Sequence, residues 1–250
     1  MTTRLFHVSD VHFGVEDRAC LDQVAKAVRE ERPDALVCTG DLTQRATHQQ
    51  YKEAADWFRS LGVPIWLNVG NHDMPYKNLW ERFTDPYRRY NALREAVAVD
   101  SFETPDVVLV GLKSTVRIQP RFPWSDGFVT EQALSETQKE LHALQGDDRH
   151  IVVTTHHPLL GPKGEAKNPT IGGDAAFAAL GQAGAQAVLS GHIHKPLDEI
   201  RELAGARIRM LGSGTLSSRL RHGAGPSYRA LTFTKGEPIA SELRELEPSA

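Results

Sequence analysis

Five short polar clusters, each directly after an apolar run typical of a buried strand, constrain the fold of this chain more than any other feature. They are Asp10-Val11-His12, Gly40-Asp41, Gly70-Asn71-His72-Asp73, His156-His157-Pro158 and Gly191-His192-Ile193-His194. Any one of them is common in a chain of this size, but five in succession are hard to reach by chance. Carboxylate, amide and imidazole groups together suit divalent manganese, iron, cobalt or zinc. The sequence therefore predicts a metal site.

The first part of the chain alternates between strand-like and helix-like segments. The apolar run at 35–39 is typical of a strand buried in a parallel sheet. Thr47 and Gln50 have the spacing of a capping box at the start of a helix that Gly62 ends. Strands are expected over 5–9, 35–39 and 64–69, and helices over 21–28 and 47–62. Because ligands in open α/β folds collect where the carboxyl ends of strands meet, the polar clusters should converge in space.

The remainder of the chain has a less regular pattern, and no repeat or linker marks a boundary in it. A single domain over residues 1–250 is therefore expected. The stretch 117–126, which contains Pro120, Pro123 and Trp124, is the best candidate for a mobile loop over the site. Helices are expected over 83–97, 130–144 and 175–180, strands over 98–102, 107–112, 151–155 and 187–190, and antiparallel strands over 208–211, 229–234 and 239–243.

The composition is that of an ordinary globular protein, with 40% apolar and 24% charged residues. A formal charge of -3 argues against a general surface for nucleic acid or for anionic membranes. No run approaches the ~20 apolar residues of a membrane span, and no apolar leader precedes the first strand. The two cysteines, Cys20 and Cys38, are expected as buried thiols, which favours a reducing, cytoplasmic location.

The order of the clusters resembles the calcineurin-like metallophosphoesterase superfamily, whose pattern is D-x-H, G-D, G-N-H-D/E, H and G-H-x-H. The resemblance covers residues 10–194. It implies an α/β fold, a four-layer α/β/β/α sandwich with mixed sheets and a dinuclear metal site at the carboxyl ends of the strands. It also implies two divalent ions as cofactors, of manganese, iron or zinc.

The resemblance further implies which residues bind the metals. Asp10, His12 and His194 would bind the first ion, Asn71, His156 and His192 the second, and Asp41 would bridge both. Physical chemistry agrees, because two cations ~3.5–4 Å apart need a bridging carboxylate to offset their repulsion. The alternation of His192, Ile193 and His194 also lets an extended segment aim two imidazoles at one side.

Three residues beside these ligands have alternative roles. The family pattern takes the first histidine of H-x-P, which favours His156 as the ligand and leaves His157 behind it or near the substrate. His72 matches the family histidine that protonates the leaving group, and the alternative is a side chain packed behind the metals. Asp73 either orients His72 or caps the segment that follows it.

Substrate contacts are expected outside the metal ligands as well. Arg45 follows the Gly-Asp cluster closely, and Arg219 and His222 lie in the stretch 213–223, which is either a substrate-facing loop or a solvated basic loop. With His157, they form the set of candidate substrate-binding residues. Three glycines are expected to allow close backbone approach or a positive φ, namely Gly40, Gly70 and Gly191.

Among the branches of the superfamily, the motifs look most like the bacterial class III cyclic nucleotide phosphodiesterases and related small phosphodiesterases. The resemblance implies hydrolysis of a 3′,5′-cyclic nucleotide or another small phosphodiester, by a metal-bridging hydroxide with His72 as general acid and Asp41 as a catalytic residue. Phosphodiesters should be preferred to monoesters, since no arginine clamp for a dianion is evident from the sequence.

Three alternatives belong to other functional classes. A DNA exonuclease of the superfamily shares G-N-H-D, but no basic stripe is visible in this chain. A phosphomonoesterase would use the same metal chemistry, although the protein phosphatases carry G-N-H-E where this chain has Gly70 to Asp73. A non-enzymatic scaffold that binds metal and partners should have lost ligands, and none is lost. A small phosphodiester, with no membrane, is thus the expected partner.

Overall fold

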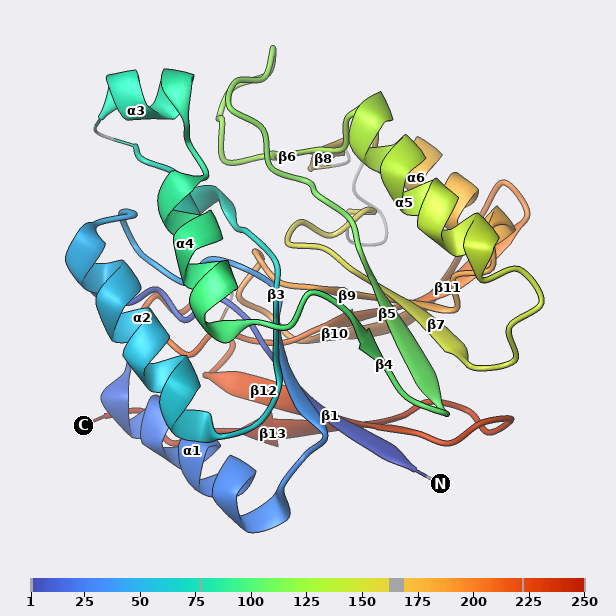
Figure 1. Cartoon of the computed structure of the whole chain (residues 1–250), viewed down its shortest axis with the longest axis horizontal. Helices are drawn as coiled ribbons and strands as arrows, with labels where there is room; N and C mark the ends of the chain where they lie inside the picture. The colour runs from blue at the N-terminus through green and yellow to red at the C-terminus, as the bar shows by residue number, and fades with distance from the viewer. Residues whose placement is uncertain (1, 77, 162–168, 222, 250) are drawn as a thin grey trace.

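Two β-sheets, packed face to face, form the centre of the molecule in this computed structural model (Figure 1). The structure describes residues 2–76, 78–161, 169–221 and 223–249. The first sheet has the order β13 (Ala240–Glu245), β12 (Ser227–Phe233), β1 (Thr3–Val8), β2 (Ala35–Cys38), β3 (Ile65–Leu67). The second has the order β10 (Leu197–Leu203), β11 (Ala206–Gly212), β9 (Ala187–Ser190), β7 (His150–Thr154), β5 (Val107–Gly111), β4 (Phe102–Glu103). A separate short pair joins β6 (Gly127–Phe128) to β8 (Thr170–Ile171).

Helices cover the outer face of each sheet. Against the first sheet lie α1 (Arg18–Glu31), α2 (His48–Leu61) and α4 (Arg88–Val97). Against the second lie α5 (Glu131–Ala143) and α6 (Gly173–Gln182). The short helix α3 (Leu79–Thr84) stands apart from both layers (Figure 1), and a 3₁₀ turn spans Asn71–Asp73. Both sheets contain parallel and antiparallel pairs, so the predicted α/β/β/α sandwich with mixed sheets is confirmed.

The central strands, such as β1 and β2, are apolar on both faces because each face is covered. In β1, Leu5 packs between the two sheets, whereas Phe6 and Val8 pack against the helices of the outer layer. This follows from the two-residue period of a strand, which turns successive side chains to opposite faces. Burying a side chain of this size contributes about 1.5–3 kcal/mol, so the strands are held from both sides.

Two helix predictions need correction. Thr47 caps α2 by accepting a hydrogen bond from the backbone N–H of Gln50, but the Gln50 side chain accepts from the Arg45 backbone N–H, so the capping box is only half formed. The helix expected over 83–97 is interrupted between α3 and α4. Pro86 explains the break, because a proline disfavours helical geometry at the residue before it, and Asp85 has a φ of -145°.

The C-terminal strands also differ from the expectation. β12 and β13 are antiparallel as predicted, but β11 pairs parallel with β9 on one side and antiparallel with β10 on the other. The sequence analysis missed β10, whose residues are all partly or fully exposed and which therefore lacks an apolar run. The last two strands place residues 227–245 in the same sheet as the first strand of the chain.

Both cysteines of the chain are described, and both are buried free thiols, as predicted. Burial raises the pKa of each thiol, which keeps it protonated and unreactive at neutral pH. Within the described part of the chain, every helix is too short or too polar to cross a bilayer.

Candidate metal centre

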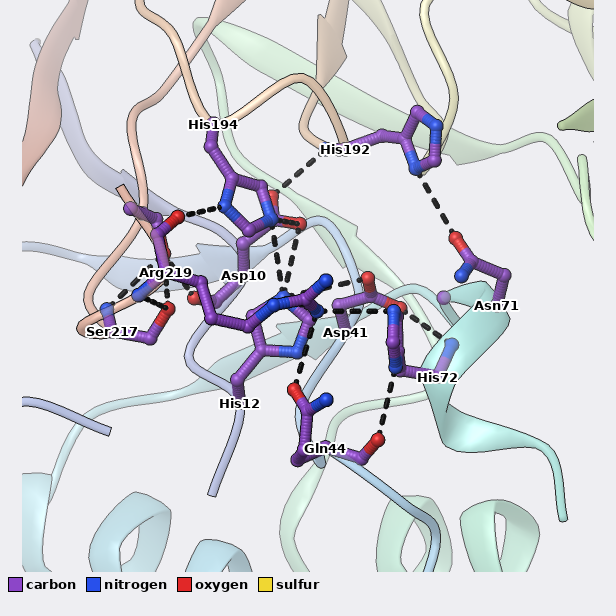
Figure 2. Close-up of polar contacts among 12 residues, drawn as sticks. Asp10, His12, Asp41, Gln44, Asn71, His72, His192, His194, Ser217 and Arg219 are labelled. Atoms are coloured by element: carbon purple, nitrogen blue, oxygen red, sulfur yellow. Dashed lines mark hydrogen bonds and ion pairs between the residues drawn. The ribbon is translucent and has the colours of Figure 1, made fainter. Parts of the chain in front are cut away.

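The ends of parallel strands bring the five polar clusters together. β1, β2 and β3 run parallel in the first sheet, and β7 and β9 run parallel in the second. Their carboxyl ends lead into Asp10, Asp41, Asn71, His156 and His192 respectively. Figure 2 shows the side chains of four of these residues, Asp10, Asp41, Asn71 and His192, gathered around one centre. The predicted convergence is therefore present in the structure.

A first group of donor atoms comes from the clusters after β1 and β9. The Nε2 atoms of His12 and His194 lie 3.1 Å apart. Oδ1 of Asp10 lies 3.1 Å from Nε2 of His194 and 3.7 Å from Nε2 of His12. All three side chains are buried. Within the described part of the chain, Asp10 Oδ1 accepts no well-directed hydrogen bond, which leaves a buried acceptor facing two imidazoles.

A second group surrounds the amide oxygen of Asn71. This oxygen lies 3.2 Å from Nε2 of His156 and 3.1 Å from Nδ1 of His192. Oδ2 of Asp41 lies 3.5 Å from Nε2 of His156 and 3.7 Å from Nε2 of His12. The same carboxylate oxygen therefore faces both groups, while Asp41 Oδ1 accepts the backbone N–H of His72 at 2.8 Å.

The spacing within each group fits a divalent cation. Ligand atoms at about 2.1 Å from a tetrahedral metal lie about 3.4 Å from one another. The donor pairs here are separated by 3.1–3.7 Å. Oxygen and nitrogen donors of this kind suit manganese, iron or zinc without selecting one of them. Buried acceptors crowded this closely repel one another unless a cation or proton lies between them.

Hydrogen bonds behind the imidazoles direct their other nitrogens inward. Nδ1 of His156 donates to the carbonyl oxygen of Thr39 at 2.8 Å, and Nδ1 of His194 donates to that of Arg219 at 2.6 Å. Each bond leaves Nε2 as the nitrogen that faces the donor group. Such bonds from a ligating histidine fix its tautomer and orientation.

Strained backbone also positions these side chains. Asp10, His12, Asp41, His192 and His194 all have a φ between 51° and 70°, a region that non-glycine residues rarely adopt. Each such residue costs about 1–3 kcal/mol, and strain of this kind clusters at functional sites. The backbone N–H groups of Asp10 and His12 bond to the carbonyls of Gly40 and Asp41, which helps to hold the conformation.

Two of the three glycines show why a side chain is excluded. A Cβ on Gly70 would lie 2.2 Å from the backbone nitrogen and Oδ1 of Asp41. A Cβ on Gly191 would lie 1.8 Å from the hydroxyl of Ser9 and 2.6 Å from Oδ2 of Asp10. The close backbone approach predicted for these glycines is therefore present. At Gly70 it joins the ends of neighbouring strands of the first sheet, and at Gly191 it joins strand ends of the two sheets.

Burial and the attraction between opposite charges set the protonation states of the cluster. Burial lowers the pKa values of His12 and His192 to about 3, so both rings are neutral. Burial also opposes ionisation of Asp41 and His156, but their mutual attraction outweighs it. The pKa of Asp41 is held well below its usual range, and that of His156 is raised to about 9.

His72 lies at the edge of this cluster with one nitrogen anchored. Its Nδ1 donates to the carbonyl oxygen of Gln44 at 2.9 Å. Its Nε2 lies 3.1 Å from Nη1 of Arg219, which also contacts Gln44 Oε1 at 3.2 Å and His12 Nε2 at 3.4 Å (Figure 2). Nε2 is thus the nitrogen of His72 that remains to face a substrate.

Asp73 and His157 have supporting contacts. The Asp73 carboxylate accepts backbone N–H groups from Leu42, Thr43 and Gly70 at 2.9–3.2 Å. All three precede Asp73 in the chain, so these contacts hold the turn against the segment after β2 and match neither the orientation of His72 nor a cap on the following segment. Nε2 of His157 donates to the carbonyl of Ser125, and its Nδ1 accepts from the hydroxyl of Ser114. Although the His157 ring lies beside His156 and His192, both of its nitrogens are already engaged.

A cavity of about 390 Å³ opens over the two donor groups. Its lining includes the predicted ligands Asp41, Asn71, His192 and His194. The sequence analysis missed further lining residues, namely Gln44, Tyr76, Ser125, Asp126 and Arg221. Gln44 directly precedes Arg45 in the sequence, Ser125 and Asp126 end the loop expected to cover the site, and Arg221 lies in the stretch 213–223. Tyr76 alone among these five had no sequence signal.

Only some of the candidate catalytic and substrate-binding residues line this cavity. His72 and Arg219 line it. Arg45 is exposed and is not among the described residues that line it, and His157 is buried behind the histidines. His222 lies outside the described residues. No arginine clamp was evident from the sequence, but Arg219 and Arg221 both border the cavity.

Comparison with known proteins agrees with this geometry. The sequence pattern of the family described as calcineurin-like phosphoesterases matches residues 3–196. A Synechococcus protein named as a probable cyclic nucleotide phosphodiesterase is 26% identical over 215 residues, which cover 81% of this chain and 78% of that protein. An Arcobacter nitrofigilis protein named as a probable glycerophosphodiester phosphodiesterase is 28% identical over 129 residues, and the match spans only 42% of its length and 51% of this chain.

A solved structure shows the same fold. A dimetal phosphatase from Danio rerio superposes with a TM-score of 0.67 at 12% identity, covering 97% of this chain and 96% of that one. At this identity the likeness concerns the arrangement of sheets and helices alone.

Proposed function

Because the chain belongs to the calcineurin-like phosphoesterase family, we propose that this phosphoesterase hydrolyses a small phosphodiester, with a 3′,5′-cyclic nucleotide as the first candidate. The main support is the sharing of Asp41 Oδ2 between two groups of buried donor atoms under a cavity of about 390 Å³. A cavity of this size suits a small organic ligand. Relatives named as cyclic nucleotide or glycerophosphodiester phosphodiesterases support the same substrate class.

The seven donor residues would hold two divalent cations. Asp10, His12 and His194 would bind one cation, Asn71, His156 and His192 the other, and Asp41 both. When bound, such a pair supplies positive charge for the phosphoryl oxygens and makes water nucleophilic at neutral pH. With only two carboxylates against two dications, the site would keep a net positive charge that attracts a phosphodiester anion.

His72 would transfer a proton at Nε2. Its Nδ1 proton is engaged with Gln44, so Nε2 is the atom that can give a proton to a departing ester oxygen. The backbone N–H of the same residue donates to Asp41, which ties the position of the ring to the proposed bridging carboxylate. An acid held in this way reaches the leaving group without being a ligand.

Arg219 would donate to a non-bridging phosphoryl oxygen. It comes from the segment after β11, which crosses to the first sheet, and it ends among His12, Gln44 and His72. A guanidinium in this place can stabilise the charge that develops on phosphorus-bound oxygens in the transition state. When it turns to the substrate, Nε2 of His72 becomes free for the leaving group.

The two arginines also favour a second candidate, phosphomonoester hydrolysis. A monoester dianion would gain more than a diester monoanion from Arg219 and Arg221 beside two cations. The DNA exonuclease and the binding scaffold have no such support.

We also propose that residues 1–250 form one catalytic domain, because β12 beside β1 ties the C-terminal part to the sheet that positions Asp10.

A substrate panel tests the proposed function. Metal-reconstituted protein would be assayed on cyclic nucleotides, glycerophosphodiesters, phosphomonoesters and single-stranded DNA. We expect the highest kcat/KM for a small diester, and its loss on chelation. Faster hydrolysis of monoesters would favour the second candidate, whereas strong, salt-sensitive competition by single-stranded DNA would favour a nuclease.

A further inference from the structure

One residue that lines the cavity, Tyr76, has a phenol ring that neither the donor groups nor His72 account for. Tyr76 lines the cavity four residues after His72, and 63% of its surface is exposed. On the same side lie Ser125 and Asp126, at the end of the loop that contains Trp124. The phosphodiester group itself needs only the polar part of the cavity. Tyr76 therefore faces the organic group that is esterified to the phosphate.

Arg82 connects Tyr76 to the loop that contains Trp124. Its guanidinium carbon lies 5.9 Å from the ring centroid of Tyr76 and 5.7 Å from that of Trp124. Although charged, Arg82 is only 2% exposed, and its Nε donates to the carbonyl oxygen of Arg117 at 3.1 Å. Among the described residues, no hydrogen-bond partner serves its Nη1. Cation–π contact on two rings is thus its main compensation for burial.

The Tyr76 ring is held on a fixed backbone. Met74 and Pro75 are buried directly before it, and the hydroxyl of Tyr51 donates to the carbonyl of Asp73 at 2.5 Å. The loop that contains Trp124 is anchored at Ser125, whose carbonyl accepts a hydrogen bond from Nε2 of His157. A large exposed aromatic on rigid supports binds a flat ligand with little loss of conformational entropy.

We propose that Tyr76, supported by Arg82 and Trp124, forms a stacking platform for the aromatic base of a nucleotide whose phosphodiester occupies the metal site. This inference rests on the proposed function and selects nucleotides within its substrate class. Stacking on a single aromatic ring tolerates any base, because every base has a π-face. The platform therefore distinguishes nucleotides from glycerophosphodiesters but not one base from another.

The test compares substrates with and without a base in the metal-loaded protein. Tyr76→Ala should lower kcat/KM for cyclic AMP roughly 5- to 100-fold, mainly through KM. It should leave kcat/KM for glycerophosphoethanolamine within about twofold of wild type. Tyr76→Phe keeps the ring and should retain both activities. Trp80→Ala is the matched control, because Trp80 is 80% exposed nearby but is not among the described residues lining the cavity.

A binding measurement separates this inference from the proposed function. Calorimetry should show that Tyr76→Ala weakens binding of 5′-AMP by the same factor, with binding of glycerol 3-phosphate unchanged. Equal losses for both ligands, or equal losses in Trp80→Ala, would overturn the platform even if phosphodiesterase activity is intact. If wild-type protein hydrolyses no diester, the proposed function fails, and the 5′-AMP comparison alone then decides the platform.

Discussion

Nη1 of Arg219 and Nε2 of His72 lie 3.1 Å apart at the mouth of the metal centre (Figure 2). The guanidinium therefore lies directly against the nitrogen of the proposed acid. In this arrangement Nε2 accepts a hydrogen bond from the guanidinium. Nε2 can take up a proton and pass it to a leaving group only when Arg219 has turned to a better acceptor. A phosphoryl oxygen is such an acceptor, which couples substrate binding to release of His72.

We predict that Arg219→Ala weakens both binding and catalysis. Loss of a charge-assisted hydrogen bond to the phosphoryl group should lower kcat/KM by about 10- to 100-fold. Arg219→Lys should recover part of the loss, since it restores charge without the planar fork. Steady-state kinetics on the preferred diester measure this, with Arg207→Ala as the control because Arg207 is exposed and paired with Glu202. An Arg219→Ala enzyme with wild-type kinetics would remove the residue from the site.

For His72, the leaving group distinguishes acid catalysis from other roles. His72→Ala should keep both metals and lose roughly 10²–10⁴-fold in rate on a nucleoside diester, whose alkoxide leaves poorly without a proton. The loss should be much smaller for a para-nitrophenyl ester, whose phenolate leaves unaided. Equal losses on both substrates would point to stabilisation of phosphoryl charge instead, and loss of metal would make His72 a structural neighbour of Asn71.

Metal binding should depend on pH through His156. In the metal-free protein the pKa of His156 is raised to about 9, so the ring is protonated at pH 7 and a cation must displace that proton. Affinity should therefore rise by roughly tenfold per pH unit between pH 6 and 8. The same shift stabilises the metal-free fold fully below pH 6.5, and that contribution is lost as the pH rises through about 9.

Calorimetry in two buffers with different ionisation enthalpies counts the protons released. We expect about one proton per bound pair of ions at pH 7 from this histidine. His48→Gln should leave the count unchanged, because His48 is exposed at the start of α2. An affinity that is flat between pH 6 and 8 would contradict the assignment of His156 as a ligand.

The backbone contact between Gly70 and Asp41 gives a prediction about architecture. Gly70→Ala would place a methyl group 2.2 Å from Asp41, so the proposed bridging carboxylate must move. We expect weaker binding of both ions and a lower thermal midpoint. Gly225→Ala serves as the control, since no described atom lies within 4 Å of its added Cβ. Equal metal content in the Gly70→Ala and Gly225→Ala proteins would show that the contact has no functional weight.

Much of the fold followed from local sequence patterns. Apolar runs such as 35–39 marked buried strands, and Thr47 and Gly62 marked the two ends of α2, because these signals depend on a few neighbouring residues. The partly exposed strand β10 gave no such signal, since its pairing with β11 is set by tertiary contacts. Pro86, by contrast, was a local signal for the break between α3 and α4. The prediction of one helix over 83–97 followed the helical periodicity and overlooked this proline.

The candidate site was predictable only for residues of metal-binding type that directly follow a strand. The donor residues follow strand ends directly, so topology alone brings them together. Tyr76, Ser125 and Arg221 reach the cavity from loops, whose paths depend on packing between distant segments. The stack of Arg82 between Tyr76 and Trp124 likewise joins residues that no sequence spacing connects.

The number of ions bound to the wild-type protein and to two variants, each lacking one proposed ligand, tests the central claim most directly. Elemental analysis of protein purified without chelator should give up to two divalent ions per chain. Asp41→Ala should lose both, because Oδ2 of Asp41 faces both donor groups, whereas Asn71→Ala should lose mainly one. A wild-type protein that remains fully active after verified removal of metal, or an Asp41→Ala protein that retains two ions, would contradict the dinuclear site.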